Sequence, residues 1–152
     1  MIKLPQFQLS VIIGLILSDG WFGHSNRNIN AKLYFKQTLS HSQYVWFVFS
    51  ILSHYCTSCP SLVTGVRAGK RYFGLEMYTR ALPCFKELHS LFYPNGIKVV
   101  PYNIYELLTP PALAHLIMGD GSVKPQGLTI WTDSYSLVDT VRLMNVLILL
   151  MI

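Results

Sequence analysis

The fold of this chain is decided by the stretch ALAHLIMGDGS, Ala112–Ser122. It follows Thr109-Pro110-Pro111, and a threonine before prolines is typical of the first turn of a helix. The stretch therefore predicts a mostly buried helix that ends at Asp120. A carboxylate at the C-terminal end of a helix opposes the helix dipole and costs about 0.3–1 kcal/mol. The simplest explanation is an Asp-Gly turn that ends the helix before a strand.

The same arrangement occurs a second time, near the start of the chain. The stretch VIIGLILSDGWF, Val11–Phe22, is an apolar run followed by Ser-Asp-Gly. After both Asp19-Gly20 and Asp120-Gly121 the pattern predicts a hairpin and then a helix. In the second copy, the second strand is predicted over 128–134 and the helix over 136–152. Such a repeat indicates two units related by pseudo-symmetry, which a single turn does not explain.

Two helices that pack side by side need small residues where their backbones approach, and Gly14 supplies one in the first helix. His115 of the second helix is interpreted as a buried core residue without a catalytic role. If the helices are parallel, Asp19 and Asp120 come together at their ends, and two like charges at one site need a cation between them. Mg²⁺ prefers carboxylate and carbonyl oxygens and supports in-line hydrolysis of phosphodiesters.

The stretches IIGLILSDG (Ile12–Gly20) and LAHLIMGDG (Leu113–Gly121) resemble the two signature helices of LAGLIDADG homing endonucleases of the double-motif, organellar intron-encoded type. The connecting segment, Tyr93–Pro101 and the NIYELLTPP that follows, is similar to that family too. The resemblance covers nearly the whole chain. It implies an α+β fold of pseudo-twofold α-β-β-α-β-β-α units with saddle-shaped antiparallel sheets. The implied organisation is a first unit at 1–93, a linker at 94–108 and a second unit at 109–152.

The resemblance also implies an activity, which is site-specific cleavage of both strands of DNA with Mg²⁺ or another divalent metal ion. One aspartate from each motif, Asp19 and Asp120, is the expected metal ligand. Ser18 and Gly119, which precede the aspartates, complete the expected ligand set.

Three further positions are matched to the family's site by the same resemblance. Arg80 matches a basic residue near the scissile phosphates. Gln37 or Lys36 matches a polar residue that orders water at the metal ions, and Thr132 is the weaker match in the second unit.

Alternate residues of a strand face opposite sides of a sheet. Polar and basic residues alternate with apolar ones in Asn28–Thr38, and the hairpin predicted over Val63–Arg80 turns at Ala68-Gly69 and places Phe73 on its apolar side. A basic and aromatic face fits phosphate contacts and base reading by β-ribbons, although any half-exposed antiparallel sheet alternates in this way. The expected nucleic-acid-binding residues are Asn30, Lys32, Tyr34, Lys36, Arg67, Lys70, Tyr72, Glu76, Tyr78, Thr129 and Trp131.

The composition favours a polyanionic partner. The 152 residues carry a net charge of +5 with a pI of about 9.2, which indicates salt-sensitive binding to nucleic acid. The chain is 51% hydrophobic, but no apolar run approaches the ~20 residues of a spanning helix, so no membrane partner is expected. The start of the chain does not resemble a signal or transit peptide, which fits synthesis inside a mitochondrion and fits a cytosolic protein equally. Cys56, Cys59 and Cys84 are interpreted as reduced thiols.

The second copy is shorter than the first. The first runs 72 residues from Asp19 to Leu91 (91 − 19 = 72), whereas 32 residues follow Asp120 (152 − 120 = 32). A second hairpin and a closing helix are therefore expected to be missing from the second unit, leaving an apolar helix face that favours association. The alternatives are an RNA-binding maturase that assists group I intron splicing, an inactive truncated remnant, or a small membrane-associated protein.

Overall fold

The computed structural model describes residues 3–24 and 29–152. Its contacts form two compact units, one of Asp19–Lys86 and one that combines the chain up to Ser18 with Glu87–Ile152. The contacts thus group the first signature helix with the second copy of the repeat. The unit boundaries predicted from the repeat, 1–93, 94–108 and 109–152, stay a prediction. The predicted turn after Asp19-Gly20 includes residues 25–28, which lie outside the described residues.

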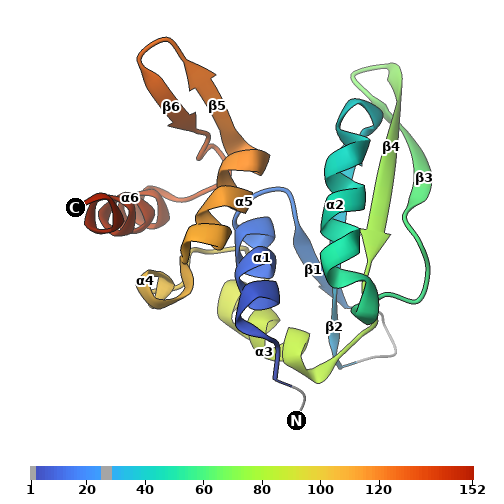
Figure 1. The fold of residues 1–152 in the computed structure, drawn as a ribbon, viewed down its shortest axis with the longest axis horizontal. Coiled ribbons are helices and arrows are strands. Elements are labelled where there is room, and N and C mark those ends of the chain that lie inside the picture. The colour runs from blue at the N-terminus through green and yellow to red at the C-terminus, as the bar shows by residue number, and fades with distance from the viewer. Residues whose placement is uncertain (1–2, 25–28) are drawn as a thin grey trace. The chain divides into compact units, whose positions relative to one another are not determined.

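The first unit is a four-stranded antiparallel sheet with a helix against one face (Figure 1). Helix α2 packs on the second and fourth strands, and 3₁₀ turns flank it at Leu39–His41 and Ser53–Tyr55. The strands lie in the order β1-β2-β4-β3. The predicted strand before α2 and the predicted hairpin after it are both present in this sheet. The elements of this unit are β1 (Trp21–His24), β2 (Ala31–Thr38), α2 (Ser42–Leu52), β3 (Ser61–Arg67) and β4 (Lys70–Tyr78). The next helix, α3 (Pro83–Phe92), begins in this unit and ends in the second.

Alternation along β2 separates the core face of this sheet from its open face. Ala31 and Phe35 are buried, and the Phe35 ring meets Tyr44 of α2 edge to face at 5.2 Å, which confirms the predicted core side. The prediction that Phe73 shares this core is wrong, because its side chain is 49% exposed. The pairing of β4 with β2 ends at Gly74, so Phe73 lies in the part of the hairpin that extends past β2.

The β3-β4 hairpin turns at the predicted dipeptide. The φ angles of Ala68 and Gly69 are 50° and 75°. Positive φ at both central residues is the type I′ geometry, whose twist matches that of the flanking strands. The turn therefore fixes the register in which β3 and β4 pair.

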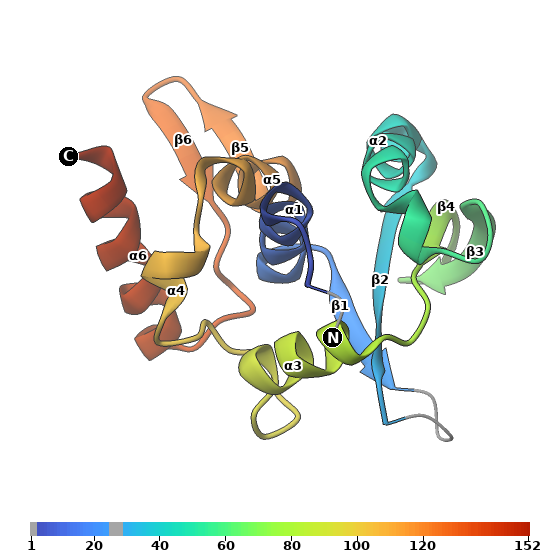
Figure 2. The ribbon, with the colours of Figure 1, turned by 60° about the horizontal axis from the view of Figure 1, so that its bottom comes forward.

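The second unit contains the two signature helices, α1 (Gln6–Leu17) and α5 (Pro110–Asp120), packed side by side (Figures 1 and 2). Every residue of α1 from Ser10 to Leu17 is buried. Helix α5 begins as predicted, because the Thr109 hydroxyl accepts a hydrogen bond from the Ala112 amide at 3.4 Å. The remaining elements are α4 (Ile104–Leu107), the antiparallel pair β5 (Gly121–Lys124) and β6 (Gly127–Ile130), and α6 (Leu137–Met151).

The segment after β6 differs from the prediction. The strand expected over 128–134 ends at Ile130. The Trp131 amide still donates to the carbonyl of Asp120 at 2.8 Å, but the Tyr135 amide donates to Thr132 at 2.9 Å. A local turn therefore takes these backbone groups away from the sheet before α6 begins.

Helix α6 is capped by Ser136, whose hydroxyl accepts a hydrogen bond from the Asp139 amide at 3.1 Å. Arg142 forms an ion pair with the Asp139 carboxylate at 3.1 Å. Apolar side chains such as Ile148, 55% exposed, form the predicted apolar face of this helix. No helix that the structure describes is long and apolar enough to span a membrane.

Replacing Ser136 by alanine should lower the free energy of unfolding by about 1 kcal/mol, because an amide of the first turn of α6 loses its partner. Urea denaturation of the variant and the unchanged chain measures this difference. Ser58→Ala, at an exposed position in a bend, is the control and should leave the midpoint where it is. Equal midpoints for the two variants would contradict a stabilising cap.

Candidate functional site

The signature helices run parallel in close contact. The Thr109 hydroxyl donates to that of Ser10 at 2.7 Å, and one turn further along both helices Gly14 lies against Ala112 and His115. A Cβ on Gly14 would lie 2.4 Å from the Ala112 carbonyl oxygen and 2.6 Å from the His115 Cβ. Only glycine fits at this approach, as the sequence predicts. His115 is buried, which lowers its pKa and confirms it as a core residue.

Side chains bind the last carbonyl groups of α1. The Ser18 hydroxyl donates to a carbonyl one turn back at 2.9 Å. The Lys98 ammonium donates to the Ser18 carbonyl at 3.2 Å, and the Tyr135 hydroxyl donates to the carbonyl of Leu17. These carbonyls lack partners within the helix. The contacts therefore fix the backbone that leads into Asp19.

Lys98 and Tyr135 are site residues that sequence reasoning missed. They are 80 and 118 residues away in sequence from the carbonyls that they bind, so no local pattern marks them. A cation beside the C-terminal carbonyls of a helix is favoured by the helix dipole. Lys98 thus places the compensating positive charge at the end of the first signature helix.

Asp120 is the last residue of α5 and is half-buried. Gly119, the predicted carbonyl ligand, precedes it in the last turn. Burial raises the pKa of the Tyr135 hydroxyl, and the negative charge of Asp120 adds to this shift. Tyr135 therefore stays protonated as a hydrogen-bond donor at the end of α1, with the Asp120 charge near it.

Asp19 is exposed, and its Oδ2 accepts a hydrogen bond from Gln37 Nε2 at 2.6 Å. Of the two candidates Gln37 and Lys36, the structure brings Gln37 to the carboxylate. Burial raises the pKa of Tyr44, and the negative charge of Asp19 adds to the shift. Asp19 belongs to the first compact unit and Asp120 to the second, so their pairing stays a prediction.

The face of the sheet opposite α2 carries a row of aromatic rings. Trp21 and Tyr34 stack with centroids 5.5 Å apart at 7°, and Tyr34 contacts Tyr78 at 5.7 Å. The Lys32 ammonium lies 5.4 Å from the centre of the Tyr78 ring. Lys36 is 6.0 Å from the centre of the Trp21 ring. Sequence reasoning also missed Trp21 as a site residue. Its position two residues after Asp19, on the short strand β1, could have indicated a place near the site.

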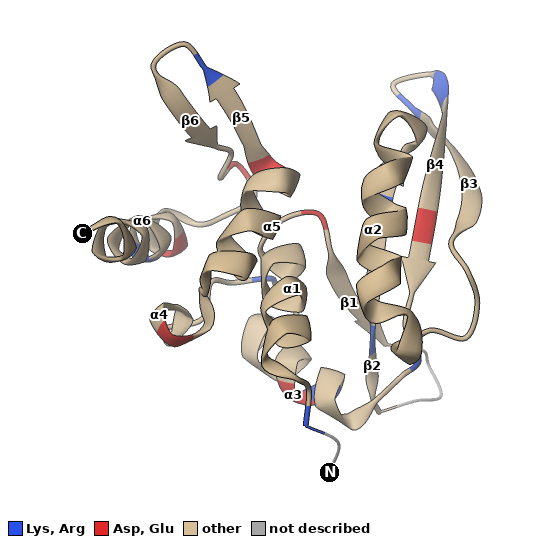
Figure 3. Ribbon diagram, in the orientation of Figure 1, with Lys and Arg blue, Asp and Glu red and all other residues tan. Residues whose placement is uncertain are grey.

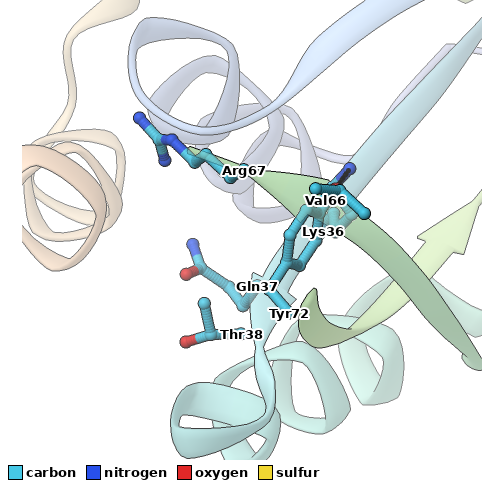
Figure 4. Close-up of a pocket in the computed structure, with 6 residues that line it drawn as sticks. All are labelled: Lys36, Gln37, Thr38, Val66, Arg67 and Tyr72. Atoms are coloured by element: carbon cyan, nitrogen blue, oxygen red, sulfur yellow. Dashed lines mark hydrogen bonds between the residues drawn. The ribbon is translucent and has the colours of Figure 1, made fainter. Parts of the chain in front are cut away.

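A cavity of about 410 Å³ opens on this sheet (Figure 4). In Figure 4 the side chains of Arg67, Gln37 and Thr38 extend toward the same side. One of the lining residues, Gln37, also donates a hydrogen bond to the candidate catalytic carboxylate of Asp19. The lining residues are Lys36, Gln37, Thr38, Val66, Arg67 and Tyr72.

The other predicted nucleic-acid contacts are spread over both sheets. Lys and Arg gather at the turn between β3 and β4 (Figure 3), where Lys70 is exposed. Glu76 lies opposite Lys36 in the register of β2 and β4. Asn30 and Thr129 are half-buried, beside β2 and on β6. Trp131 is 51% exposed, and the Lys124 ammonium lies 5.8 Å from its ring centre.

Arg80 is exposed just past β4, where its guanidinium donates to the Cys56 carbonyl at 3.5 Å. Gln37 pairs with Leu75, further back along β4, so the structure does not bring Arg80 to Asp19. Burial raises the pKa of the Cys56 thiol to about 11, against the opposing effect of Arg80. All three cysteines are free thiols, as predicted. Thr132 is half-buried in the turn after β6.

The donors predicted for a divalent cation are oxygen atoms. The carboxylates of Asp19 and Asp120 and the carbonyl of Gly119 are, each by itself, the kind of hard oxygen donor that Mg²⁺ prefers. The Ser18 carbonyl fits less well, because it accepts the Lys98 ammonium at 3.2 Å and a second cation on the same oxygen would be repelled.

Comparisons with known proteins show the family to which the chain belongs. The LAGLIDADG DNA endonuclease family matches residues 9–150. The cytochrome b mRNA maturase bI2 of Debaryomyces hansenii is 31% identical over 148 residues, which are 95% of this chain and 56% of that protein. The DNA endonuclease I-ChuI of Chlamydomonas applanata is 28% identical over 161 residues, covering 95% of this chain and 73% of the relative.

Among solved structures, the homing endonuclease I-WcaI bound to its DNA recognition sequence has a TM-score of 0.87 and 22% sequence identity. The match covers 97% of this chain and 68% of that one. The likeness confirms the α+β homing-endonuclease fold that the repeated motifs predict.

Proposed function

This chain belongs to the LAGLIDADG DNA endonuclease family, and we propose that it is a site-specific endonuclease that hydrolyses phosphodiester bonds in both strands of a DNA duplex. The observation that carries the proposal is the exposed Asp19 carboxylate, held by Gln37 at 2.6 Å beside a basic and aromatic face of a sheet. The chain spans 56% of the length of the Debaryomyces hansenii maturase.

Binding in this proposal is carried by the open face of the first sheet. Lys32, Lys36 and Arg67 supply positive charge for phosphate oxygens, and the net charge of +5 steers the polyanion toward the protein. Polar groups that alternate along β2 and β4 are spaced to reach base edges in a groove, which is how antiparallel ribbons read sequence. DNA affinity should therefore fall steeply as salt is added.

Catalysis in this proposal uses the ends of the two signature helices. The Gln37 amide donates to one oxygen of Asp19 and orients the carboxylate. Tyr135 and Lys98 hold the last carbonyls of α1 and so fix the backbone from which Asp19 extends. A divalent cation held by Asp19 and Asp120 would activate water and stabilise the charge that develops on the phosphate oxygens.

A second candidate function is RNA binding as an intron maturase. The observation that favours it is the 31% identity to the cytochrome b mRNA maturase bI2 over 95% of this chain. Contacts to phosphates carry no sequence information, so the same basic face also suits a folded RNA. A mitochondrial location is proposed on the same ground, because that relative is named for the cytochrome b messenger.

A cleavage selection tests the endonuclease against the maturase. The chain is incubated with a library of randomised DNA duplexes in Mg²⁺ and, in parallel, in excess chelator, and the cut ends are sequenced. Enrichment of one long site in Mg²⁺ alone supports the endonuclease. If no duplex is cut and the chain instead accelerates splicing of a group I intron transcript, the maturase is the function.

Replacing Gln37 by leucine should slow cleavage of the selected site by about 10–100-fold, the usual effect of losing a residue that orients a metal ligand. Affinity for the site should stay within about twofold of the original. Single-turnover cleavage and a gel-shift titration measure the two quantities. Gln43→Leu, at an exposed position of α2, is the control. An unchanged rate for Gln37→Leu would remove Gln37 from the proposed site.

A further inference from the structure

We propose that Trp21 and Tyr72 are positioning residues that hold the Lys36 ammonium in place for a phosphate group of the bound nucleic acid. The proposal rests on the proposed nucleic-acid-binding function. The new element is this pair of rings, Trp21 and Tyr72, which we call the aromatic clamp. In it Trp21 contributes a ring and no charge.

The ammonium of Lys36 lies near two aromatic rings from different strands. Its nitrogen is 6.0 Å from the centre of the Trp21 ring and 5.7 Å from that of Tyr72. It also lies 3.5 Å from the Tyr72 hydroxyl oxygen. Both distances to ring centres fall within the range of cation–π attraction. The long and flexible side chain is therefore held at its charged end.

Each ring is fixed by a neighbour of its own. Trp21 stacks on Tyr34 with centroids 5.5 Å apart and planes at 7°. The Tyr72 ring lies across Gly65 of β3, where a Cβ would be 2.5 Å from the ring. The rings thus form a rigid mount, and a charge that is ordered before binding loses less entropy when a partner arrives.

The clamp places the Lys36 charge at the cavity of the proposed nucleic-acid-binding face. Lys36 precedes Gln37, whose amide holds Asp19 at 2.6 Å, and both residues line the cavity of about 410 Å³ together with Arg67. Glu76 lies opposite Lys36 in the strand register, yet the ammonium lies over the rings. Aromatic rings hold a cation without neutralising it, so the charge stays available to a phosphate.

The second copy contains a similar pair. The Lys124 ammonium lies 5.8 Å from the centre of the Trp131 ring, and the Trp131 amide donates to the carbonyl of Asp120 at 2.8 Å. The second copy therefore also places a lysine near a tryptophan, but at positions of the repeat that differ from those of Trp21 and Lys36.

A double-mutant cycle tests the clamp. Binding of a 5′-fluorescein-labelled duplex that carries the selected site is measured by anisotropy at several KCl concentrations. Lys36→Ala should weaken binding and lower the slope of log K against log salt by about 1. Trp21→Leu should weaken binding by about two- to fivefold, and this loss should disappear when Lys36 is already alanine. Combined with Lys32→Ala, which leaves Lys36 in place, Trp21→Leu should keep its full effect.

The outcomes separate this inference from the proposed function. A loss from Trp21→Leu that is the same with and without Lys36 overturns the clamp, while DNA binding by the chain stands. A chain that binds no nucleic acid overturns the proposed function. Trp21→Phe, which keeps an aromatic ring, should restore most of the affinity, and the exposed Trp46→Leu on α2 should change nothing.

The clamp is also checked by an independent signal in the unbound chain. Protons next to the Lys36 nitrogen should be shifted upfield in the NMR spectrum by the two rings, and the shift should shrink in Trp21→Leu. Where Trp21→Leu does not fold, Tyr72→Leu repeats the cycle from the other side of the lysine, with Tyr72→Phe as the variant that retains the ring. An unshifted Lys36 signal in the unchanged chain contradicts the clamp.

Discussion

Replacing Asp19 or Asp120 by asparagine should abolish DNA cleavage and leave DNA binding in place. Each change removes one anionic oxygen ligand and keeps the shape of the side chain. Metal-assisted stabilisation is worth several kcal/mol in the transition state, and each ~1.4 kcal/mol is a factor of ten in rate. The expected loss is therefore at least about a hundredfold. Linearisation of a plasmid that carries the selected site measures it, with affinity taken from a gel shift.

The control for this prediction is Asp133→Asn, which removes the same charge from an exposed loop position and should cut normally. A chain that acts as a maturase should still assist splicing after either active-site substitution, because that function needs the surface and not the carboxylates. Cleavage at an undiminished rate by Asp19→Asn would show that the carboxylate has no part in the reaction.

The features that were predictable from the sequence are those written in local patterns or in the repeat. The apolar run that ends in Asp-Gly, found twice, predicts both signature helices, and Thr109 marks the start of α5. Period-two alternation predicts the buried side of β2, and Ala68-Gly69 predicts the hairpin. In each case residues close in sequence determine the structure, so the pattern and the element coincide.

The features that were missed depend on contacts between distant segments. Lys98 reaches the Ser18 carbonyl across 80 residues, and Tyr135 reaches Leu17 across 118. Phe73 fits the alternation of β4 but is exposed, since the strand that would cover it ends earlier. Such facts follow from packing, which a single sequence does not specify.

Replacing Gly14 by valine should remove most of the stability of the second unit. A Cβ at this position would lie 2.4 Å from the Ala112 carbonyl oxygen and 2.6 Å from the His115 Cβ, and the first of these is backbone that cannot turn away. Overpacking of a core costs about 1–3 kcal/mol when side chains can adjust, occasionally more. Removing a glycine from a helix gains at most about 1 kcal/mol. The clash therefore decides the sign, and we expect a loss of about 3 kcal/mol or more.

Thermal and urea unfolding measure this loss, and Ala114→Val is the matched control because Ala114 is an exposed position of α5. The control pays only the helix propensity of valine, about 0.5 kcal/mol. The milder Gly14→Ala should be less destabilising than Gly14→Val, and His115→Gly should restore part of its stability by removing the second clashing atom. Equal unfolding midpoints for Gly14→Val and Ala114→Val would mean that the signature helices do not approach as closely as Gly14 requires. The predicted pairing of Asp19 with Asp120 would then lose its support, because that prediction assumes that α1 and α5 pack side by side.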